Sequence, residues 1–269
     1  MNISFDTRLD LLQHAWERNP FDSDLSRANS TYAAASDDGS LVRLLETAKP
    51  SFFDRIAHAS IRDFILDPDF SCLGAKAALR SNSYRFGTYG NLADASSTSG
   101  LARDLFAFAT ERRGFESTYT TYVAVFAQFD RGADPDLDFE SALWRQLSRL
   151  YALDREHHAW DSRVSQEPSD SNFSYSFAGT GFFVVGLHPE STRAARRFAW
   201  PTLIFNAHEQ FAELKSRGQF ARLQDRIRTR EIALDGSLNP NLADFGDHSE
   251  ARQYAGRPLP QEWTCPFRR

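Results

Sequence analysis

The sequence contains little sulfur. Two cysteines, Cys72 and Cys265, and one methionine occur among 269 residues. Two cysteines so far apart do not form the disulfide framework of a small secreted protein, and a disulfide between them is not expected in a reducing compartment. Each thiol is therefore expected to be a buried, unreactive side chain, unless it ligates a metal or acts as a nucleophile.

The sequence also lacks long apolar runs and a strong excess of one charge. No stretch approaches the ~20 apolar residues of a membrane-spanning helix. Residues 1–19 carry scattered charges instead of the apolar block of a signal peptide. The net charge of −5 gives no bulk attraction to nucleic acid. We therefore expect a cytoplasmic protein with neither a membrane nor a nucleic-acid partner.

Aromatic residues, in contrast, are abundant. The chain has 23 phenylalanines and five tryptophans, and 41% of its residues are hydrophobic, which is enough for a sizeable core. Such side chains either fill a core or wall a cavity for a planar cofactor, and composition does not separate the two.

Strands are predicted mainly by short apolar or alternating segments. Residues 173–177 alternate aromatic and small polar side chains, and residues 182–187 are continuously apolar. The two glycines in the small segment between them predict a hairpin. Further strands are expected at 84–89, 202–205 and 117–129, of which the last is rich in β-branched and aromatic residues on both faces.

Helices are predicted by apolar residues at helical spacing, with loops between them. Residues 51–65 form one amphipathic helix, and a long helix after His208 is expected to break near Gly218. Residues 91–100 are serine-rich and predict a loop, and residues 1–38 predict a helix followed by a polar connection. The order of these elements is not a strict β–α alternation, so we expect an α+β fold, one domain over 1–269, with a mixed or antiparallel sheet flanked by helices.

Two segments carry residues suited to chemistry. Cys72 precedes Gly74 and an alanine-rich helix, so its thiolate would be stabilised at a helix N-terminus, and the glycine would let a flat ligand approach the backbone. The connection after residue 187 is suited to an anionic ligand, although surface ion pairs are the simpler interpretation of its arginines. It contains His188, Arg193, Arg196 and Arg197.

Several short aromatic motifs occur together and in order. They lie at residues 70–75, 173–189, 206–211, 236–242, 249–254 and 263–267. With these motifs the chain resembles the YqcI/YcgG family, also called GntA-like. The resemblance implies a haem-dependent monooxygenase that hydroxylates a guanidine nitrogen of free L-arginine, or of an amino acid derived from it, in a natural-product pathway such as antibiotic biosynthesis. It further implies haem b as cofactor, O₂ as co-substrate and an external electron donor, protein or small reductant.

This chemistry favours a thiolate as the axial ligand, because a thiolate pushes electron density toward iron and promotes O–O cleavage. Cys72 at a helix start and Cys265 before a proline are the two candidates, and Cys72 also resembles the Cys–x–Gly turn of large haem-thiolate monooxygenases. His208 and His188 lie in the motif-rich region and remain as histidine alternatives.

The remaining roles fall to charged residues. Arginines bind carboxylates in bidentate fashion, so Arg193, Arg196 and Arg197 are candidates for the haem propionates, with His188 beside them. A guanidinium substrate needs a carboxylate, for which Glu209 and Glu250 are candidates because each lies inside a shared motif. The α-carboxylate of an amino acid would need a cation such as Arg252.

Three alternatives stay open. One is a protein that binds or senses haem without turnover. Another is a haem-free enzyme with Cys72 as nucleophile and His188 or His208 as base. A metal site at Glu156, His157 and His158 is less favoured, because adjacent histidines do not face one way on a helix. The oligomeric state, including a homodimer, stays open.

Overall fold

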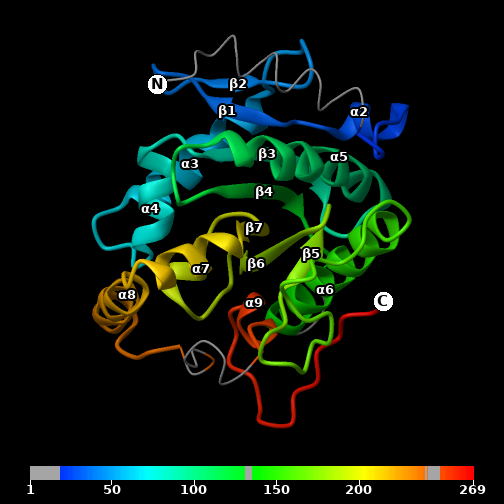
Figure 1. Cartoon of the computed structure of the whole chain (residues 1–269). Coiled ribbons are helices and arrows are strands. Elements are labelled where there is room, and N and C mark those ends of the chain that lie inside the picture. Colours follow the sequence, from blue (N-terminus) through cyan, green and yellow to red (C-terminus); the bar gives the residue numbers. More distant parts are fainter. Residues whose placement is uncertain (1–18, 131–134, 240, 242–248) are drawn as a thin grey trace.

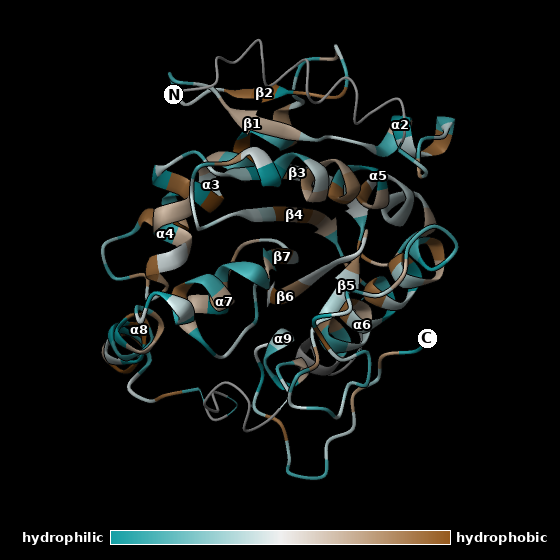
Figure 2. Cartoon of the chain, viewed as in Figure 1, coloured by the Kyte–Doolittle hydropathy of each residue, from teal (hydrophilic) through white to brown (hydrophobic). Residues whose placement is uncertain are grey.

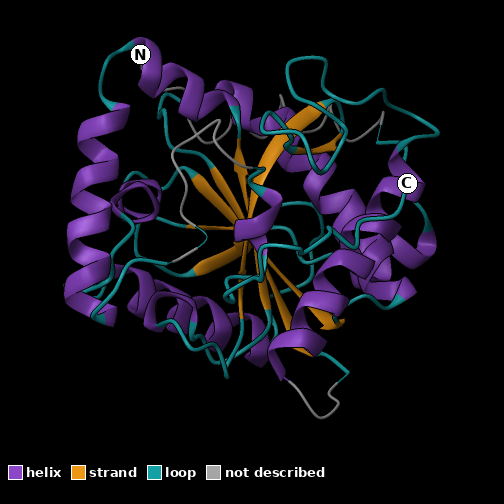
Figure 3. Ribbon diagram, turned by 90° about the horizontal axis from the view of Figure 1, so that it is seen from below, coloured by secondary structure: helices purple, strands orange, loops and turns teal. Residues whose placement is uncertain are grey.

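The computed structural model describes residues 19–130, 135–239, 241 and 249–269. In this part of the chain, seven strands form one sheet in the order β2-β1-β3-β4-β7-β6-β5, with helices on both sides (Figure 1). Seen from below, the strands cross the middle and the helices surround them (Figure 3). β3 and β4 pair in parallel and the other neighbours pair antiparallel. The predicted α+β fold with a mixed, helix-flanked sheet is confirmed.

The strands predicted from the sequence are all present, with shifted ends. They are β3 (Tyr84–Asn91), β4 (Thr121–Gln128), β5 (Tyr175–Phe177), β6 (Thr180–Leu187) and β7 (Thr202–Ala207). The β5–β6 hairpin turns at Ala178 and Gly179, both of which have positive φ. The central strand β4 is covered on both faces, which is why its residues are apolar on both.

Two strands at one end of the sheet were not expected. β1 (Ala33–Ala35) lies within the segment read as a polar connection, and β2 (Leu41–Arg43) follows it. The prediction of a polar connection was wrong at β1. Three successive alanines lack the β-branched and aromatic side chains that indicate a strand. The strand exists because its backbone pairs with β2 on one side and, at Ala33, with Phe86 of β3 on the other.

The helices follow the expected pattern except at one place. They are α2 (Asp24–Asn29), α3 (Phe52–Leu66), α4 (Leu73–Arg80), α5 (Ala95–Glu111), α6 (Pro135–Asp154), α7 (Glu209–Ser216), α8 (Phe220–Asp235) and α9 (Ala251–Tyr254). The expected break near Gly218 is confirmed, since this glycine has a φ of 65° between α7 and α8. The predicted loop at 91–100 is wrong, because α5 begins at Ala95 and buries the small residues Ser97, Thr98 and Gly100.

The two faces of the sheet carry different helices. In β4, Tyr122 and Phe126 point to a core shared with α5 and α6, whereas Val123 and Val125 point to a second core shared with α3 and α4. Successive side chains of a strand point to opposite faces, so alternate residues of β4 serve the two cores. Figure 2 shows hydrophobic residues along β4 and hydrophilic ones on α7 and α8.

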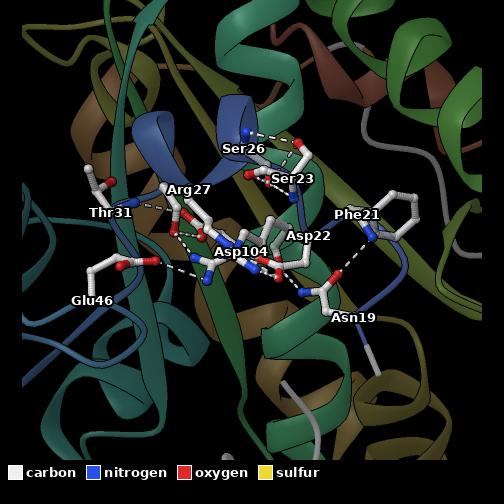
Figure 4. A network of polar contacts seen from close by, with 11 residues as sticks. Asn19, Phe21, Asp22, Ser23, Ser26, Arg27, Thr31, Glu46 and Asp104 are labelled. Carbon is white, nitrogen blue, oxygen red and sulfur yellow. Dashed lines mark hydrogen bonds and ion pairs between the residues drawn. The ribbon is translucent and has the colours of Figure 1, made fainter. Parts of the chain in front are cut away.

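A buried polar network fixes the segment before β1 to α5 (Figure 4). Asp104 of α5 accepts hydrogen bonds from the Ser30 hydroxyl, from the backbone N–H of Thr31 at 3.0 Å and from the Tyr89 hydroxyl at 2.7 Å. Burial raises the pKa of Asp104 to about 6, against the hydrogen bonds that lower it. The neighbouring Arg103 reaches Asp22 at 2.8 Å.

Replacing Gly100 by alanine is expected to destabilise the fold by about 3 kcal/mol, at the upper end of what overpacking costs. A Cβ at Gly100 would lie 2.2 Å from the backbone oxygen of Asn29, and backbone atoms cannot rotate away. Urea unfolding measures the loss. Gly114→Ala is the matched control, because its Cβ would meet nothing within 4 Å, and it should change stability by less than about 1 kcal/mol. Equal stability of the two variants would contradict the close approach of the two segments.

Candidate functional site

A cavity of about 240 Å³ lies between the sheet and the helices α4, α7 and α8. We call it the α8 cavity. Its lining includes Cys72, Gly74, Tyr119, Thr121, Phe183, Asn206, Phe220, Leu223, Ile227, Arg228 and Glu250. Its walls are mainly apolar and aromatic, with a few polar groups, which is the usual make-up of a ligand site.

The floor of the cavity is a row of side chains on three adjacent strands. Asn206 of β7 is paired with Thr121 of β4 on one side and with Phe183 of β6 on the other. Paired residues of neighbouring strands point to the same face, so the three side chains stand side by side. They lie on the face that carries α3 and α4, just beyond the last buried valines of that core.

The first wall is the start of α4, where Cys72 is the N-cap. Its sulfur accepts a hydrogen bond from the backbone N–H of Ala75 at 3.5 Å. Burial raises the pKa of the thiol, while the backbone N–H groups of Ala75 and Gly74 favour the thiolate. The sequence prediction of a cysteine at a helix N-terminus is confirmed, and the structure adds that the cysteine lines a cavity.

The opposite wall is one face of α8. Phe220, Leu223 and Ile227 recur at helical spacing and all line the cavity, as does Arg228. Sequence analysis found the apolar stripe of this helix but assigned it no functional role. The sequence did carry an indication of this wall. An apolar stripe on a largely hydrophilic helix indicates a face that packs against other groups.

Glu250 is the buried acid of the cavity. Its Oε1 lies 2.7 Å from the hydroxyl oxygens of both Ser174 and Tyr254. Burial raises the pKa of Glu250 to about 8, although both hydrogen bonds lower it. Among the described residues no donor is bonded to Oε2. At neutral pH the carboxyl is therefore mostly protonated, and it would ionise when a cation enters the cavity.

The raised pKa of Glu250 predicts that the contribution of this carboxyl to wild-type stability falls as pH rises. Between pH 4.5 and pH 8 the unfolded chain releases this proton while the folded chain keeps it. This difference in proton binding lowers the free energy of unfolding by up to about 1.4 kcal/mol per pH unit. Glu250→Gln lacks this titration, so its stability relative to wild type should improve by a few kcal/mol from pH 5 to pH 8, as measured by urea unfolding. A difference that does not change with pH would show that the carboxyl titrates normally.

The other cysteine lies elsewhere. Cys265 is half-buried, packs against the core of α5 and α6, and is not among the described residues that line the α8 cavity. Burial raises the pKa of its thiol to about 12. Its surroundings suit an unreactive thiol.

The two candidate histidines are also outside the lining described for the cavity. His188 is buried and stacks on Phe139, with ring centroids 4.5 Å apart. His208 precedes α7, where its backbone N–H binds the carbonyl oxygen of Gly181 at 2.8 Å, and burial lowers the pKa of its ring. His208 is the N-cap residue of α7.

The three candidate arginines for propionates bind protein groups. Arg193 is buried and pairs with Glu231 at 2.8 Å and with Asp235 at 3.3 Å. Arg196 donates to the carbonyl of Gly186 at 3.1 Å, and burial lowers its pKa to about 10. Arg197 is exposed and donates to backbone carbonyls of its own loop. In the described lining of the α8 cavity, the arginine present is Arg228 instead.

Glu209 and Arg252 are likewise occupied. Burial opposes ionisation of Glu209, but hydrogen bonds from Arg112 and Arg163 outweigh it and lower its pKa. Arg252 donates to the carbonyl of Pro260 at 2.6 Å and lies over the ring of Trp263. Of the residues predicted from the sequence, the structure thus brings Cys72 and Glu250 together at one cavity.

No three His, Cys, Asp or Glu side chains of the described chain are grouped so that they could hold a metal ion. At the less favoured Glu156–His157–His158 segment, His158 binds Asp154 at 2.8 Å and His157 packs on Phe21. Across the ranges that the structure describes, no helix has the length and apolar character to span a membrane.

Comparison with known proteins identifies the family of this chain. The sequence matches the YqcI/YcgG family over residues 61–268. The chain belongs to this family. It is 26% identical over 205 residues to the uncharacterized protein YqcI of Bacillus subtilis (strain 168), an alignment that covers 74% of this chain and 80% of that protein. No solved structure matches this chain. All described lining residues of the α8 cavity lie inside the part that matches the YqcI/YcgG family.

Proposed function

We propose that this YqcI/YcgG protein is a haem-dependent monooxygenase that hydroxylates a guanidine nitrogen of free L-arginine or an arginine-derived amino acid. The resemblance to enzymes of this kind suggests the reaction. The observation that supports it is that a helix-capping thiol, Cys72, and a buried carboxyl, Glu250, both line one aromatic cavity.

The donor chemistry of the α8 cavity fits haem. One sulfur, Cys72, faces an apolar space, and haem needs only such an axial ligand from the protein. Gly74 lies two residues after Cys72, but a Cβ there would meet the ring of Tyr119 at 3.3 Å, so Tyr119 occupies the space over the glycine that was expected to admit a flat ligand. The volume of about 240 Å³ is below the ~300–1,000 Å³ of drug-sized ligand sites, so the cavity would have to widen to admit a porphyrin.

Bound haem would supply O₂ activation, with electrons from an external donor, and a thiolate ligand favours O–O cleavage. The protein would supply the axial ligand from Cys72. Apolar side chains of α8 exclude water from the reacting nitrogen.

Glu250 is the residue that would hold the substrate guanidinium. A cation beside it would lower its pKa, so the carboxyl would lose its proton as the substrate binds. Ser174 and Tyr254 fix Oε1 by hydrogen bonds, which leaves Oε2 to accept from a guanidinium N–H. Such an arrangement orients one terminal nitrogen of the guanidine group.

The geometry gives less support to a haem-free cysteine enzyme. Burial raises the pKa of the Cys72 thiol, whereas a nucleophilic cysteine needs a lowered one. A base would also be required, and neither His188 nor His208 is among the described residues lining the cavity.

An absorption spectrum tests the proposal. The full chain is expressed with a haem precursor and measured oxidised, then reduced under CO. We expect a Soret band, and arginine-dependent O₂ consumption with a reductase. Colourless protein that stays colourless on adding haem would refute the proposal. A Soret band without arginine-dependent O₂ consumption would favour a haem-binding protein without turnover.

A further inference from the structure

A second concavity lies away from the α8 cavity, between β2, the segment that follows it and one face of α3. Its volume is about 670 Å³, within the ~300–1,000 Å³ of sites for drug-sized ligands. We call it the β2–α3 pocket. Most of its lining precedes residue 61, where the family match begins, so the proposed oxygenase chemistry does not account for it.

Cations dominate this pocket although the chain as a whole is acidic. Arg55, His58 and Arg62 recur at helical spacing on the pocket face of α3, and Lys49 comes from the segment before the helix. Arg55 donates to the carbonyl of Pro50 at 2.6 Å. In the described part of the chain, no carboxylate pairs with Lys49, Arg55 or Arg62.

The other charges of the pocket are largely neutralised. Arg43 pairs with Asp54 at 2.8 Å, and Glu46 pairs with Arg103 at 2.9 Å. Asp63 offsets one positive charge on the rim. The remaining excess positive charge is what a bound anion would neutralise.

His58 adds a buried donor to these cations. It is 3% exposed and lines the pocket, and its Nε2 lies 2.7 Å from the Tyr84 hydroxyl. Arg62 donates to the same hydroxyl oxygen at 2.9 Å, and the Tyr84 hydroxyl can donate its own proton to Nε2. Burial lowers the pKa of His58 to about 4, so the ring is neutral, and the tautomer that accepts from Tyr84 carries its proton on Nδ1. No residue in the described ranges is bonded to Nδ1.

We propose that the β2–α3 pocket binds a phosphate-bearing small molecule, held by Lys49, Arg55 and Arg62, with His58 Nδ1–H donating to it. Arginines grip phosphate oxygens in bidentate fashion, and several cations around one site favour a multiply charged group over a single carboxylate. Because His58 is almost wholly buried, a ligand must enter the concavity to reach it, as a small molecule does and a flat protein surface does not.

Titration calorimetry of the full chain with inorganic pyrophosphate at low salt tests this proposal. We expect saturable 1:1 binding that weakens with added salt. Arg55→Gln and Arg62→Gln should each weaken binding at least tenfold. Arg55 is exposed, so its variant should keep the fold even if Arg62→Gln, which loses the contact to Tyr84, does not. Arg80→Gln, an exposed arginine of α4 outside the pocket, should bind as wild type does.

Two further measurements decide the ligand class. The Nδ1–H resonance of His58 should shift when pyrophosphate binds, and citrate at the same concentration should bind more weakly. Absence of saturation at millimolar pyrophosphate, or equal affinity of Arg55→Gln and Arg80→Gln, would overturn the proposal. Tighter binding of citrate would replace phosphate by polycarboxylate as the ligand class.

Discussion

Cys72→Ala is expected to bind haem at least tenfold more weakly than wild type does. The thiolate-type absorption band of its reduced CO complex should also disappear. Removing a ligand should cost more than the ~10–100-fold in affinity that a change to an outer-shell group costs. Alanine at this position keeps the start of α4, because the sulfur makes a single weak capping contact at 3.5 Å. Haem content per chain and the reduced CO spectrum measure the effect.

Cys265→Ala is the matched control for this substitution. Both thiols are half-buried, but Cys265 packs beside the aromatic C-terminal segment and is not among the described lining of the α8 cavity. It should keep wild-type haem content and the same band position. Loss of the thiolate band in Cys265→Ala, with retention in Cys72→Ala, would move the ligand to Cys265. A histidine-type band in wild type would instead move the ligand to His208 or His188.

Glu250→Gln is expected to raise the KM for arginine about a hundredfold or more. Leaving a buried cation without its counter-charge costs about 3–5 kcal/mol. Glutamine has nearly the same shape and retains an acceptor for Ser174 and Tyr254, so the fold and the haem site should survive. Steady-state O₂ consumption against arginine concentration gives KM, and a thermal melt at the same pH confirms the fold.

Glu209→Gln separates a carboxylate in the cavity from one outside it. Its carboxylate pairs with Arg112 at 2.7 Å and with Arg163, away from the described cavity lining. We expect an unchanged KM for arginine in this variant, with at most a small loss of stability because the pairs are partly exposed. An unchanged KM in Glu250→Gln would remove Glu250 as the substrate carboxylate.

Local sequence patterns predicted most of the sheet. The alternation in the β5–β6 hairpin, the doubly apolar β4 and the amphipathic α3 each depend on neighbouring residues, so the sequence alone located them. The prediction at the start of α5 was wrong because that helix depends on a residue far away in the chain. Its serines and its glycine have low helix propensity, and the helix forms there because Gly100 allows the backbone of Asn29 to approach closely.

The candidate site was predicted only in part. Cys72 could be found because a helix start is a local feature, and Glu250 was selected from a motif rather than from its burial. The role of the arginines depended on their partners, and Arg193 meets Glu231 and Asp235 of α8 only after folding. Arg228 was not singled out, because nothing in the sequence indicates that α8 closes the cavity.

By itself, the sequence determined the element types, the α+β class and the cysteine at a helix N-terminus, because these follow from periodicity and capping between residues near one another in the chain. Only the tertiary structure decided that Cys72 and Glu250 line one cavity and that Cys265, Glu209 and the three arginines do not. It also decided the raised pKa of Glu250, since desolvation depends on what covers a group. Two residues 178 positions apart in the chain have no local signature of lining one cavity, so this could be learned only from the folded chain.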